Sequence, residues 1–478
     1  MCINSICVNR DIVMVQSGWR PELGDTPGAA WERLVTRLEA DIAAGTLAPG
    51  ERLPPQRDLA YRLALSVGTV SRAYAEAERR GLVASHVGRG TFVAEGLGVA
   101  ATHRPDGGRI NLGMNVPPIA PVLSVASQTI QALGQREDLG AAFDYTFTAG
   151  LPAVCEAGAI WLREQGGVAR ASADRLIQTT GGQNALAIAC ASFARPGDTV
   201  LCDVATYPGN RTIAEHGGWH LRGVPADAEG MQPAALDRLA AESGARLLML
   251  IPTLHNPTTI TMSAARREEI VAVARLRDLL IIEDDIYRVF GTDEEPQPLA
   301  DLAPERVIHV TSISKALSPG LRLGFLLAPD NDALYERLLL AAQAIGYCPP
   351  AASGLILAEW LKSGLATRIL HEVQCEMVRR NSLAREILGD VIAPAGSRRS
   401  LHIWLPMDAE RARQVYERAL LANVELTPPD APFVDGHAVT GLRVCLGQPL
   451  ELSSLETALL ALKAVLNADH YANTRGVL

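Results

Sequence analysis

The sequence is poor in lysine and has no paired cysteines. Only three of its 44 basic residues are lysines, namely Lys315, Lys362 and Lys463. Any chemistry that needs a lysine amine therefore has only three candidates. The eight cysteines are scattered without a CxxC pair or a spacing typical of metal ligands. We therefore expect reduced thiols, no disulfide framework and no metal site.

Long apolar runs are also lacking. The longest uncharged stretches, 110–135 and 338–358, both contain proline and polar side chains, so neither predicts a transmembrane helix. The first 20 residues lack the basic start, apolar core and cleavage site of a signal peptide. We expect a cytoplasmic protein without a membrane role. A chain of 478 residues with 48% hydrophobic and 20% charged residues is typical of a globular protein with several domains.

Charge is distributed unevenly along the chain. Residues 29–93 carry nine arginines and seven acidic residues, whereas the whole chain has a net charge of −9. This balance argues against nucleic-acid binding by the large acidic part and permits it in the first segment.

The first segment has the pattern of a winged helix-turn-helix. Trp31, Leu34, Leu38 and Ile42 recur at helical spacing, which predicts a helix from about 28 to 45. Further helices are predicted over 56–64 and from Thr69 to about 80, and short strands over 82–86 and 91–94. We therefore predict a DNA-binding domain over 28–94, after an N-terminal tail over 1–27.

In such a domain, the second helix of the pair enters the major groove with its N-terminal residues facing the bases. Arginine suits this task because its planar fork pairs with guanine or with phosphate. The alternative is a small helical domain without a DNA role. The candidate DNA contacts are Arg57, Ser66, Thr69, Ser71 and Arg72, with Arg89 and Gly90 at the wing tip.

A Gly-, Ala- and Pro-rich stretch over 95–109 predicts a linker. After it, apolar runs alternate with helical segments. Strands are predicted over 176–178, 199–202, 247–251, 279–282 and 307–311. This alternation predicts an α/β domain with a doubly wound, mainly parallel sheet over 110–363. The pattern then changes to a long helix and mixed elements, so we predict a smaller α+β lobe over 364–478.

Several residues at predicted strand ends suit a phosphate-bearing pyridine cofactor. Lys315 follows a strand among hydroxyl residues and precedes Arg322, as a Schiff-base lysine beside a phosphate would. The other two lysines lie in amphipathic helices. Asp284 ends an apolar run, where a carboxylate could hold a pyridine nitrogen protonated, although a carboxylate pair could also cap a loop. Tyr287 and Asn256 could reach the ring oxygen, although Asn-Pro alone indicates only a turn.

Three more positions extend this set. Gly182 and Gln183 follow a strand and open a helix, where backbone N–H groups could hold a phosphate. Tyr207 could stack on a ring or could be an ordinary core or surface tyrosine. Arg443 could bind a ligand carboxylate through two hydrogen bonds or could form a surface ion pair.

The sequence of the first segment closely resembles that of the GntR family of bacterial repressors. The motifs are Leu53-Pro54-Pro55-Gln56-Arg57-Asp58-Leu59-Ala60, the turn from Ser66 to Tyr74, and Gly88-Arg89-Gly90-Thr91-Phe92-Val93. The chain departs from that family at Val67, where an arginine is common. A contact to DNA at that position would be missing or supplied elsewhere.

The rest of the chain, from about Ile110, resembles fold-type I aminotransferases that depend on pyridoxal 5′-phosphate (PLP). The resemblance implies that Lys315 forms the internal aldimine and that Asp284 pairs with the pyridine nitrogen. It assigns Asn256 and Tyr287 to the ring oxygen and Tyr207 to stacking. It assigns the phosphate to Gly182, Gln183, Ser312, Ser314 and Arg322, with Tyr145 reaching the phosphate of the other subunit, and a ligand carboxylate to Arg443. The chain departs from that family at Thr259, where glycine is usual.

The two halves in this order resemble the MocR subfamily of transcription factors. The resemblance implies a homodimer that binds PLP and an operator in double-stranded DNA, and that associates with the nucleoid when bound. The effector would be an amine, amino acid or vitamin B6 compound, sensed through aldimine exchange at Lys315. Two other hypotheses remain: an aminotransferase with a DNA-binding appendage, in which Lys315 also moves a proton, and a direct sensor of PLP.

Overall fold

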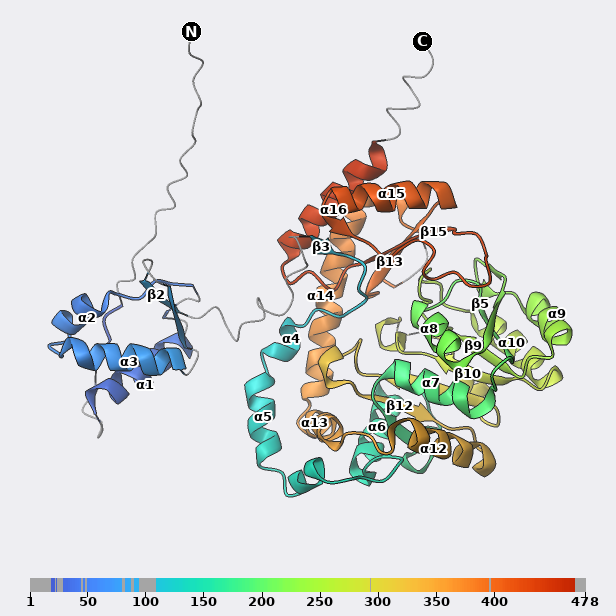
Figure 1. Cartoon of the computed structure of the whole chain (residues 1–478), viewed down its shortest axis with the longest axis horizontal. Helices are drawn as coiled ribbons and strands as arrows, with labels where there is room; N and C mark the ends of the chain where they lie inside the picture. The colour runs from blue at the N-terminus through green and yellow to red at the C-terminus, as the bar shows by residue number, and fades with distance from the viewer. Residues whose placement is uncertain are drawn as a thin grey trace, which may run out of the picture. The chain divides into compact units, whose positions relative to one another are not determined.

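The chain consists of two compact units that divide between Gly107 and Gly108 (Figure 1). The computed structural model describes residues 19–468 except 22, 24–28, 44–45, 48–49, 80–81, 87–89, 94–108, 293 and 395–396. The predicted tail and linker therefore lie almost entirely outside the described residues. Each unit is described by itself.

The first unit is a winged helix-turn-helix. Its helices are α1 (Ala30–Ala43), α2 (Gln56–Arg62) and α3 (Val67–Arg79), followed by the antiparallel strands β1 (Val83–His86) and β2 (Gly90–Val93). Leu34, Leu38, Leu59 and Val70 meet in one buried core, as their helical spacing predicts. Helix α3 begins at Val67, two residues before the predicted start, because Ser66 caps it: its Oγ accepts a hydrogen bond from the Thr69 N–H at 3.0 Å.

The second unit is built on a seven-stranded sheet. The strands are β4 (Leu176–Thr179), β5 (Thr199–Asp203), β6 (His220–Val224), β9 (Leu247–Leu250), β10 (Leu280–Asp284), β11 (Val307–Ser312) and β12 (Gly324–Leu327). Their order is β4-β12-β11-β10-β9-β5-β6, and only β12 runs antiparallel to its neighbours. All five strands predicted from the sequence lie in this sheet, and the doubly wound, mainly parallel α/β fold is confirmed.

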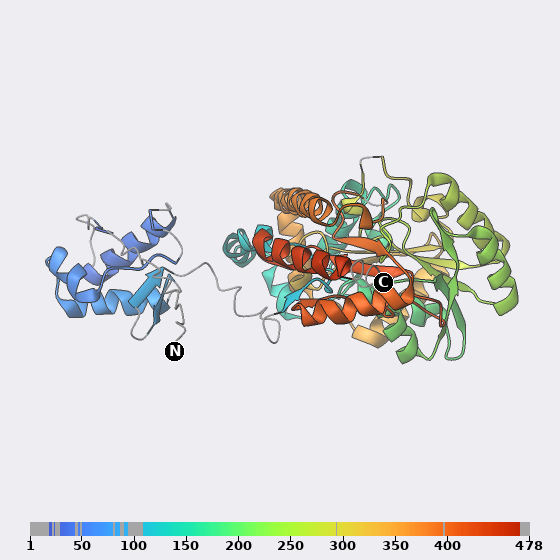
Figure 2. The same ribbon diagram turned by 90° about the horizontal axis from the view of Figure 1, so that it is seen from above.

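Helices cover both faces of the sheet (Figures 1 and 2). Successive strand residues point to opposite faces, so Leu201 joins one hydrophobic core while Val200 and Cys202 join another. The second core includes residues of α7 (Gly182–Phe193) and α12 (Asp332–Gly346). The first core includes residues of α6 (Pro152–Glu164), α9 (Pro233–Ser243), α10 (Ala264–Leu276) and α13 (Ala351–Lys362). Burial on both faces explains why these strands are apolar runs without alternation.

The C-terminal part begins with the long helix α14 (Leu365–Leu388). Strands β13 (His402–Pro406) and β15 (Gly441–Cys445) pair antiparallel, and α15 (Ala409–Leu421) packs against α16 (Leu452–Asn467) (Figure 2). The first strand of the unit, β3 (Ile110–Asn111), pairs with β14 (Val424–Glu425). The start of the body thus joins its C-terminal part, and the predicted division at 363 stays a prediction.

The remaining α-helices and strands are α4 (Ala120–Leu123), α5 (Ala126–Gly134), α8 (Pro208–Gly217), α11 (Leu299–Leu302), β7 (Ala226–Asp227) and β8 (Gly230–Met231). Among the described residues, no helix combines the length and the apolar character that crossing a bilayer requires.

Candidate functional site

The carboxyl ends of the parallel strands bring most of the predicted cofactor residues together. An outer cavity of about 530 Å³ is lined by residues that include Asn256, Tyr287, Lys315 and Arg443. An inner recess is lined by Gly182, Gln183, Tyr207, Asp284, Tyr287, Ser312, Ser314, Lys315 and Arg322. The two cavities share lining residues such as Tyr287 and Lys315. Residues as far apart in the sequence as Gly182 and Arg443 therefore belong to one region of the fold.

Lys315 is the only lysine in this region, since Lys362 and Lys463 are exposed on α13 and α16. Its Nζ donates a hydrogen bond to the carbonyl oxygen of Asn115. Burial, together with the positive charge of Arg443, lowers the pKa of Lys315 to about 8. A substantial fraction of this amine is therefore neutral near pH 8, which is the state that attacks a carbonyl carbon.

Asp284 ends β10 with its side chain buried. Burial and the neighbouring Asp285 raise the pKa of its carboxyl group to about 7. Its Oδ1 has no hydrogen-bond partner among the described residues. A buried carboxylate oxygen without a partner is costly by itself and fits a protonated pyridine nitrogen.

Arg443 on β15 is buried at the wall of the outer cavity. It donates to Asn256 Oδ1 at 2.7 Å, to Gly113 O at 2.9 Å and to Thr427 Oγ1 at 2.8 Å. No carboxylate of the described residues forms an ion pair with it, so the hypothesis of a surface ion pair is not supported there. A guanidinium that is held in place but lacks an anionic partner suits a ligand carboxylate.

Asn256 and Tyr287 are joined by hydrogen bonds. Asn256 Nδ2 donates to the Tyr287 hydroxyl at 3.3 Å, and Asn115 Nδ2 donates to the same oxygen at 2.9 Å. Both side chains thus meet in the outer cavity, and their contact with the ring oxygen stays a prediction. The Tyr207 hydroxyl donates to Gln183 Oε1 at 3.0 Å, and both residues line the inner recess.

The inner recess has the features of a phosphate site. Gly182 is the first residue of α7, so the helix N-terminus points its free N–H groups there. Gly181 has a φ of +97°, and a Cβ at this position would lie 2.9 Å from the Arg322 guanidinium. Ser312 Oγ and Ser314 Oγ are 2.9 Å apart. Hydroxyls, a helix N-terminus and an arginine fit a phosphate dianion.

Tyr145 does not line either cavity of its own chain. The residue is 80% exposed, and its ring packs edge-on against Tyr347, with ring centroids 5.3 Å apart. Its predicted contact with the phosphate of the other subunit stays a prediction.

Sequence reasoning missed two groups that support the site. Asn115 Nδ2 also lies 3.1 Å from His402 Nδ1, and the His402 ring packs edge-on against Tyr287. Burial and the charge of Arg443 lower the pKa of His402 to about 3, so this ring is neutral. Neither residue lies in a local motif, so no sequence signal marked them.

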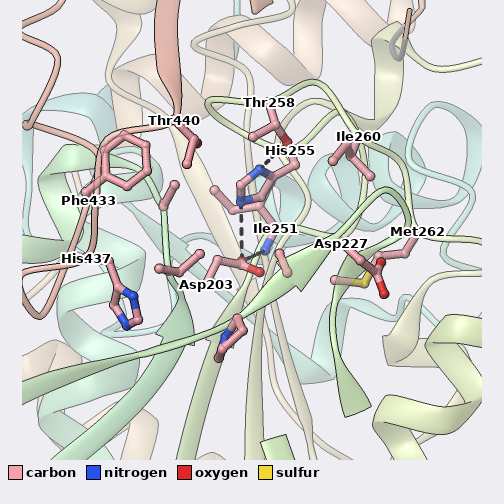
Figure 3. Close-up of a pocket in the computed structure, with 16 residues that line it drawn as sticks. Asp203, Asp227, Ile251, His255, Thr258, Ile260, Met262, Phe433, His437 and Thr440 are labelled. Carbon is pink, nitrogen blue, oxygen red and sulfur yellow. Dashed lines mark hydrogen bonds and ion pairs between the residues drawn. The ribbon is translucent and has the colours of Figure 1, made fainter. Parts of the chain in front are cut away.

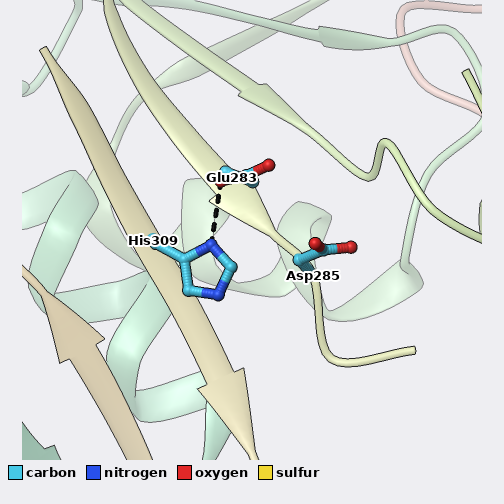
Figure 4. Close-up of side chains that lie close together, drawn as sticks. All are labelled: Glu283, Asp285 and His309. Carbon is cyan, nitrogen blue, oxygen red and sulfur yellow. Dashed lines mark hydrogen bonds and ion pairs between the residues drawn. The ribbon is translucent and has the colours of Figure 1, made fainter. Parts of the chain in front are cut away.

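A buried polar cluster lies on β10 and β11, next to Asp284 (Figure 4). Glu283 accepts hydrogen bonds from His309 Nδ1 at 2.8 Å and from the N–H groups of Leu299 and Ala300 at 2.7 and 2.9 Å. Burial opposes ionisation of Glu283, but these hydrogen bonds prevail and lower its pKa. Asp285 completes the group and lies 3.5 Å from Arg288. Glu283 is already satisfied by protein donors, so we assign this cluster to positioning β10, and the expectation of no metal stays a prediction.

In the first unit, most predicted DNA contacts lie on the exposed start of α3. Ser66 and Thr69 join their hydroxyl groups at 2.8 Å, while Ser71 and Arg72 are exposed. The Arg72 guanidinium lies 4.3 Å from the centre of the Trp31 ring, a cation–π contact that sequence reasoning missed. Arg57 is exposed on the first turn of α2, and Gly90 begins β2. Arg89 lies outside the described residues.

Comparison with known proteins gives the family of each unit. The model of the bacterial regulatory proteins of the gntR family matches residues 31–93, and that of aminotransferase class I and II matches 108–459. The uncharacterized HTH-type transcriptional regulator YdeF of Bacillus subtilis is 30% identical over 466 residues, which cover 94% of this chain and 97% of YdeF. The HTH-type transcriptional regulator TauR of Rhodobacter capsulatus is 29% identical, over 74% of this chain and 81% of TauR.

Among solved structures, the body is similar to the α-aminoadipate aminotransferase LysN of Thermus thermophilus, complexed with N-(5′-phosphopyridoxyl)-L-leucine. The TM-score is 0.67 at 25% identity, over 77% of this chain and 94% of LysN. The aminotransferase class I and II fold implies PLP as the cofactor, and the recess beside Lys315 fits this group through the partnerless Oδ1 of Asp284 and the donors around Arg322. The chain belongs to the MocR subfamily of GntR-type transcriptional regulators, in which a winged helix-turn-helix is fused to an aminotransferase class I and II domain.

Proposed function

We propose that this regulator senses a small molecule that carries an amino group, and that the sensing site is the cavity around Lys315. One observation carries the proposal. A lysine with a lowered pKa, a buried carboxylate with one partnerless oxygen and an arginine without an acidic partner line two cavities that share Lys315, in a chain that also has a DNA-binding domain.

Each residue has a proposed part. When bound, PLP supplies an aldehyde carbon that reacts reversibly with amines. Lys315 would hold that carbon when no effector is present. Asp284 would keep the pyridine nitrogen protonated, Asn256 and Tyr287 would donate to the ring oxygen, and Tyr207 would pack on the ring. The phosphate would be held by Gly182, Gln183, Ser312, Ser314 and Arg322, with Tyr145 of the partner subunit adding its hydroxyl.

An effector would displace Lys315 from the cofactor and, where it carries a carboxylate, engage Arg443. Engagement would change the hydrogen bonds from Arg443 to Asn256 and Thr427, which lie on different parts of the body. A ligand shifts a conformational equilibrium only if it binds the two states with different free energies. We propose that the changed hydrogen bonds of Arg443 produce this difference in binding free energy between the two states.

The output of the proposed switch is DNA binding by a homodimer. Each first unit would present α3 to one half-site of an operator, with Arg72 and Ser71 facing bases and Arg57 and Gly90 near phosphates. Ser66, Thr69 and Arg89 complete the proposed contact set. Because bacterial operators lie in the cytoplasm, we place the protein there.

Turnover as an aminotransferase is the second candidate function. The observation that favours it is that Lys315, Asp284 and Arg443, to which that chemistry would assign parts, line cavities that share Lys315. Lys315 would then also move a proton between two carbon atoms. A third hypothesis, a sensor of PLP alone, would need no amine.

One experiment separates the three. The chain is first loaded with PLP and then titrated with amines and amino acids, with and without a 2-oxo acid, while absorbance and operator binding are followed through both steps. A spectral shift that changes operator affinity without forming a keto product supports sensing of an amine. Steady product formation supports the enzyme, and operator binding that responds to PLP alone supports the third hypothesis. If no amine shifts the spectrum, the proposal is wrong.

A further inference from the structure

The body contains a second cavity that shares no lining residue with the cofactor site (Figure 3). Its volume is about 380 Å³, which falls within the range of about 300–1,000 Å³ typical of small-molecule sites. The ends of β5 and β9 form its floor, and the segment 433–440, which leads into β15, forms one wall.

Most of the lining is apolar. Ile251, Met262 and Phe433 are at most 7% exposed, and Ile260 adds a further branched side chain. Figure 3 shows these side chains arranged around a central space, with Phe433 on one side and Met262 on the other. The cavity therefore suits a ligand with an aromatic or branched aliphatic body.

A carboxylate lies at the floor. Asp203 is 2% exposed, and its Oδ2 accepts a hydrogen bond from the Ile251 N–H at 3.2 Å. None of the described residues donates a hydrogen bond to its Oδ1, and no arginine or lysine pairs with it. The nearest basic group is His255, whose Nε2 lies 3.6 Å from Oδ2 and has no hydrogen-bond partner. The other ring nitrogen, Nδ1, is engaged by the Thr258 hydroxyl at 2.8 Å.

The contrast with Asp227 shows what Asp203 lacks. Asp227 also lines the cavity, but Arg266 meets both of its oxygens at 3.0 and 3.1 Å. The lining itself contains two carboxylates, two histidines and no arginine or lysine. An anionic ligand would therefore meet like charge, and a neutral apolar ligand would leave Asp203 Oδ1 buried without a hydrogen-bond donor.

We infer that this cavity binds an organic cation, specifically a protonated amine with an apolar body. The ammonium group would donate to Asp203, and the body would fill the space between Phe433 and Met262. The face of an aromatic ring such as Phe433 adds an attraction for a cation. This inference does not rest on amine sensing at Lys315.

The second cavity is connected to the cofactor site through the chain and through hydrogen bonds. The carbonyl oxygen of His255 lies 3.4 Å from His402 Nε2, and the next residue, Asn256, holds Arg443 and Tyr287. On the opposite wall, Thr440 directly precedes β15, which carries Arg443. An occupant of the cavity would thus contact both segments that position the cofactor residues.

The test uses N,N-dimethyl-2-phenylethylamine as probe, because a tertiary amine cannot condense with an aldehyde and so forms no covalent adduct at the cofactor site. Its binding to the PLP-loaded full chain is measured by calorimetry, beside 3-phenylpropionate and 2-phenylethanol as the anionic and neutral counterparts. We expect saturable binding of the amine and at least about tenfold weaker binding of both counterparts, since a hydrogen bond between charged groups contributes about 1.5–3 kcal/mol.

The same magnitude predicts that Asp203→Asn weakens binding of the probe by about 10- to 150-fold. The matched control is Asp435→Asn, which removes the same charge from an exposed position outside the cavity and is expected to leave binding within about threefold. Ala438→Trp places a bulky ring at the exposed rim and is expected to block the cavity without entering the core.

Lys315→Ala is expected to retain the probe, which separates this site from the cofactor site. The inference is wrong if the probe does not bind at millimolar concentration, if the anion binds as well as the amine, or if Asp203→Asn and Ala438→Trp both leave binding unchanged. Loss of probe binding in Lys315→Ala would also overturn it. Any of these results would leave the proposal of amine sensing at Lys315 standing.

Discussion

Replacing Arg443 with methionine tests whether this arginine recognises a ligand carboxylate or only holds the cavity together. The guanidinium makes three hydrogen bonds to the protein and forms no ion pair with a described carboxylate. A hydrogen bond between charged groups contributes about 1.5–3 kcal/mol. Loss of one such bond to a ligand carboxylate would therefore weaken the binding of an amino acid by about 10- to 150-fold.

The assay compares two ligands that differ only in the carboxylate, such as leucine and 3-methylbutylamine. Both are titrated into the PLP-loaded chain while the cofactor absorbance is followed. In Arg443→Met we expect the apparent Kd of the amino acid to rise by about 10- to 150-fold, with a much smaller change for the amine. If the apparent Kd of both ligands rose equally, Arg443 would not bind the ligand carboxylate and its role would be structural.

The same substitution has a consequence for Lys315. Burial is the main reason for the lowered pKa of Lys315, and the charge of Arg443 is the next. Cofactor uptake needs the neutral amine, so its rate in the unsubstituted chain should rise with pH and level off above about 8. In Arg443→Met the midpoint should move upward, toward the ordinary value of 10.5. An unchanged midpoint would mean that the charge of Arg443 does not reach Lys315.

Three further predictions concern single residues. Lys315→Ala should abolish the absorbance of the bound lysine–cofactor linkage while leaving circular dichroism unchanged; an adduct that borohydride still traps would exclude Lys315 as the anchor. Asp284→Asn should stabilise the cofactor-free chain above pH 7 by up to about 4 kcal/mol. The sign follows because the raised pKa of Asp284, about 7 in place of 3.8, makes its ionisation unfavourable in the folded state. The advantage over the unsubstituted chain should therefore shrink as the pH falls from 7 to 4, and a denaturation series that shows a constant advantage would refute it. Arg72→Ala should weaken operator binding by about 1–3 kcal/mol without altering PLP binding, and unchanged operator affinity would mean that α3 is not the recognition helix.

The sequence was sufficient to predict the sheet and most of the candidate site because these depend on local patterns. Strands buried on both faces are apolar runs, and functional side chains follow them directly at the carboxyl edge. Lys315, Asp284 and Asn256 are each within a few residues of such a run, so their meeting at one edge follows from the parallel sheet. The antiparallel strand β12 and the edge strand β6 were not predicted individually.

The supporting groups could not be predicted, because their contacts join distant parts of the chain. Asn115 reaches Tyr287 across 172 positions and His402 across 287. No local spacing relates these residues, and an isolated asparagine or histidine in an apolar segment indicates no site by itself. The lowered pKa values of Lys315 and His402 follow from this packing and were equally absent from the sequence pattern.

In the first unit, the sequence predicted which residues could contact DNA, but it did not predict the contacts that these residues make within the protein. The hydroxyl groups of Ser66 and Thr69 contact each other, and Ser66 also caps the helix, so both are partly committed before DNA arrives. Arg72 lies over the Trp31 ring, and this contact fixes the direction of its guanidinium. Trp31 entered the sequence pattern only as one of the periodic apolar residues of α1. If Arg72 contacts a base, Trp31 orients its guanidinium for that contact. Binding is then favoured, because a guanidinium that is already held in place loses less conformational entropy when it binds.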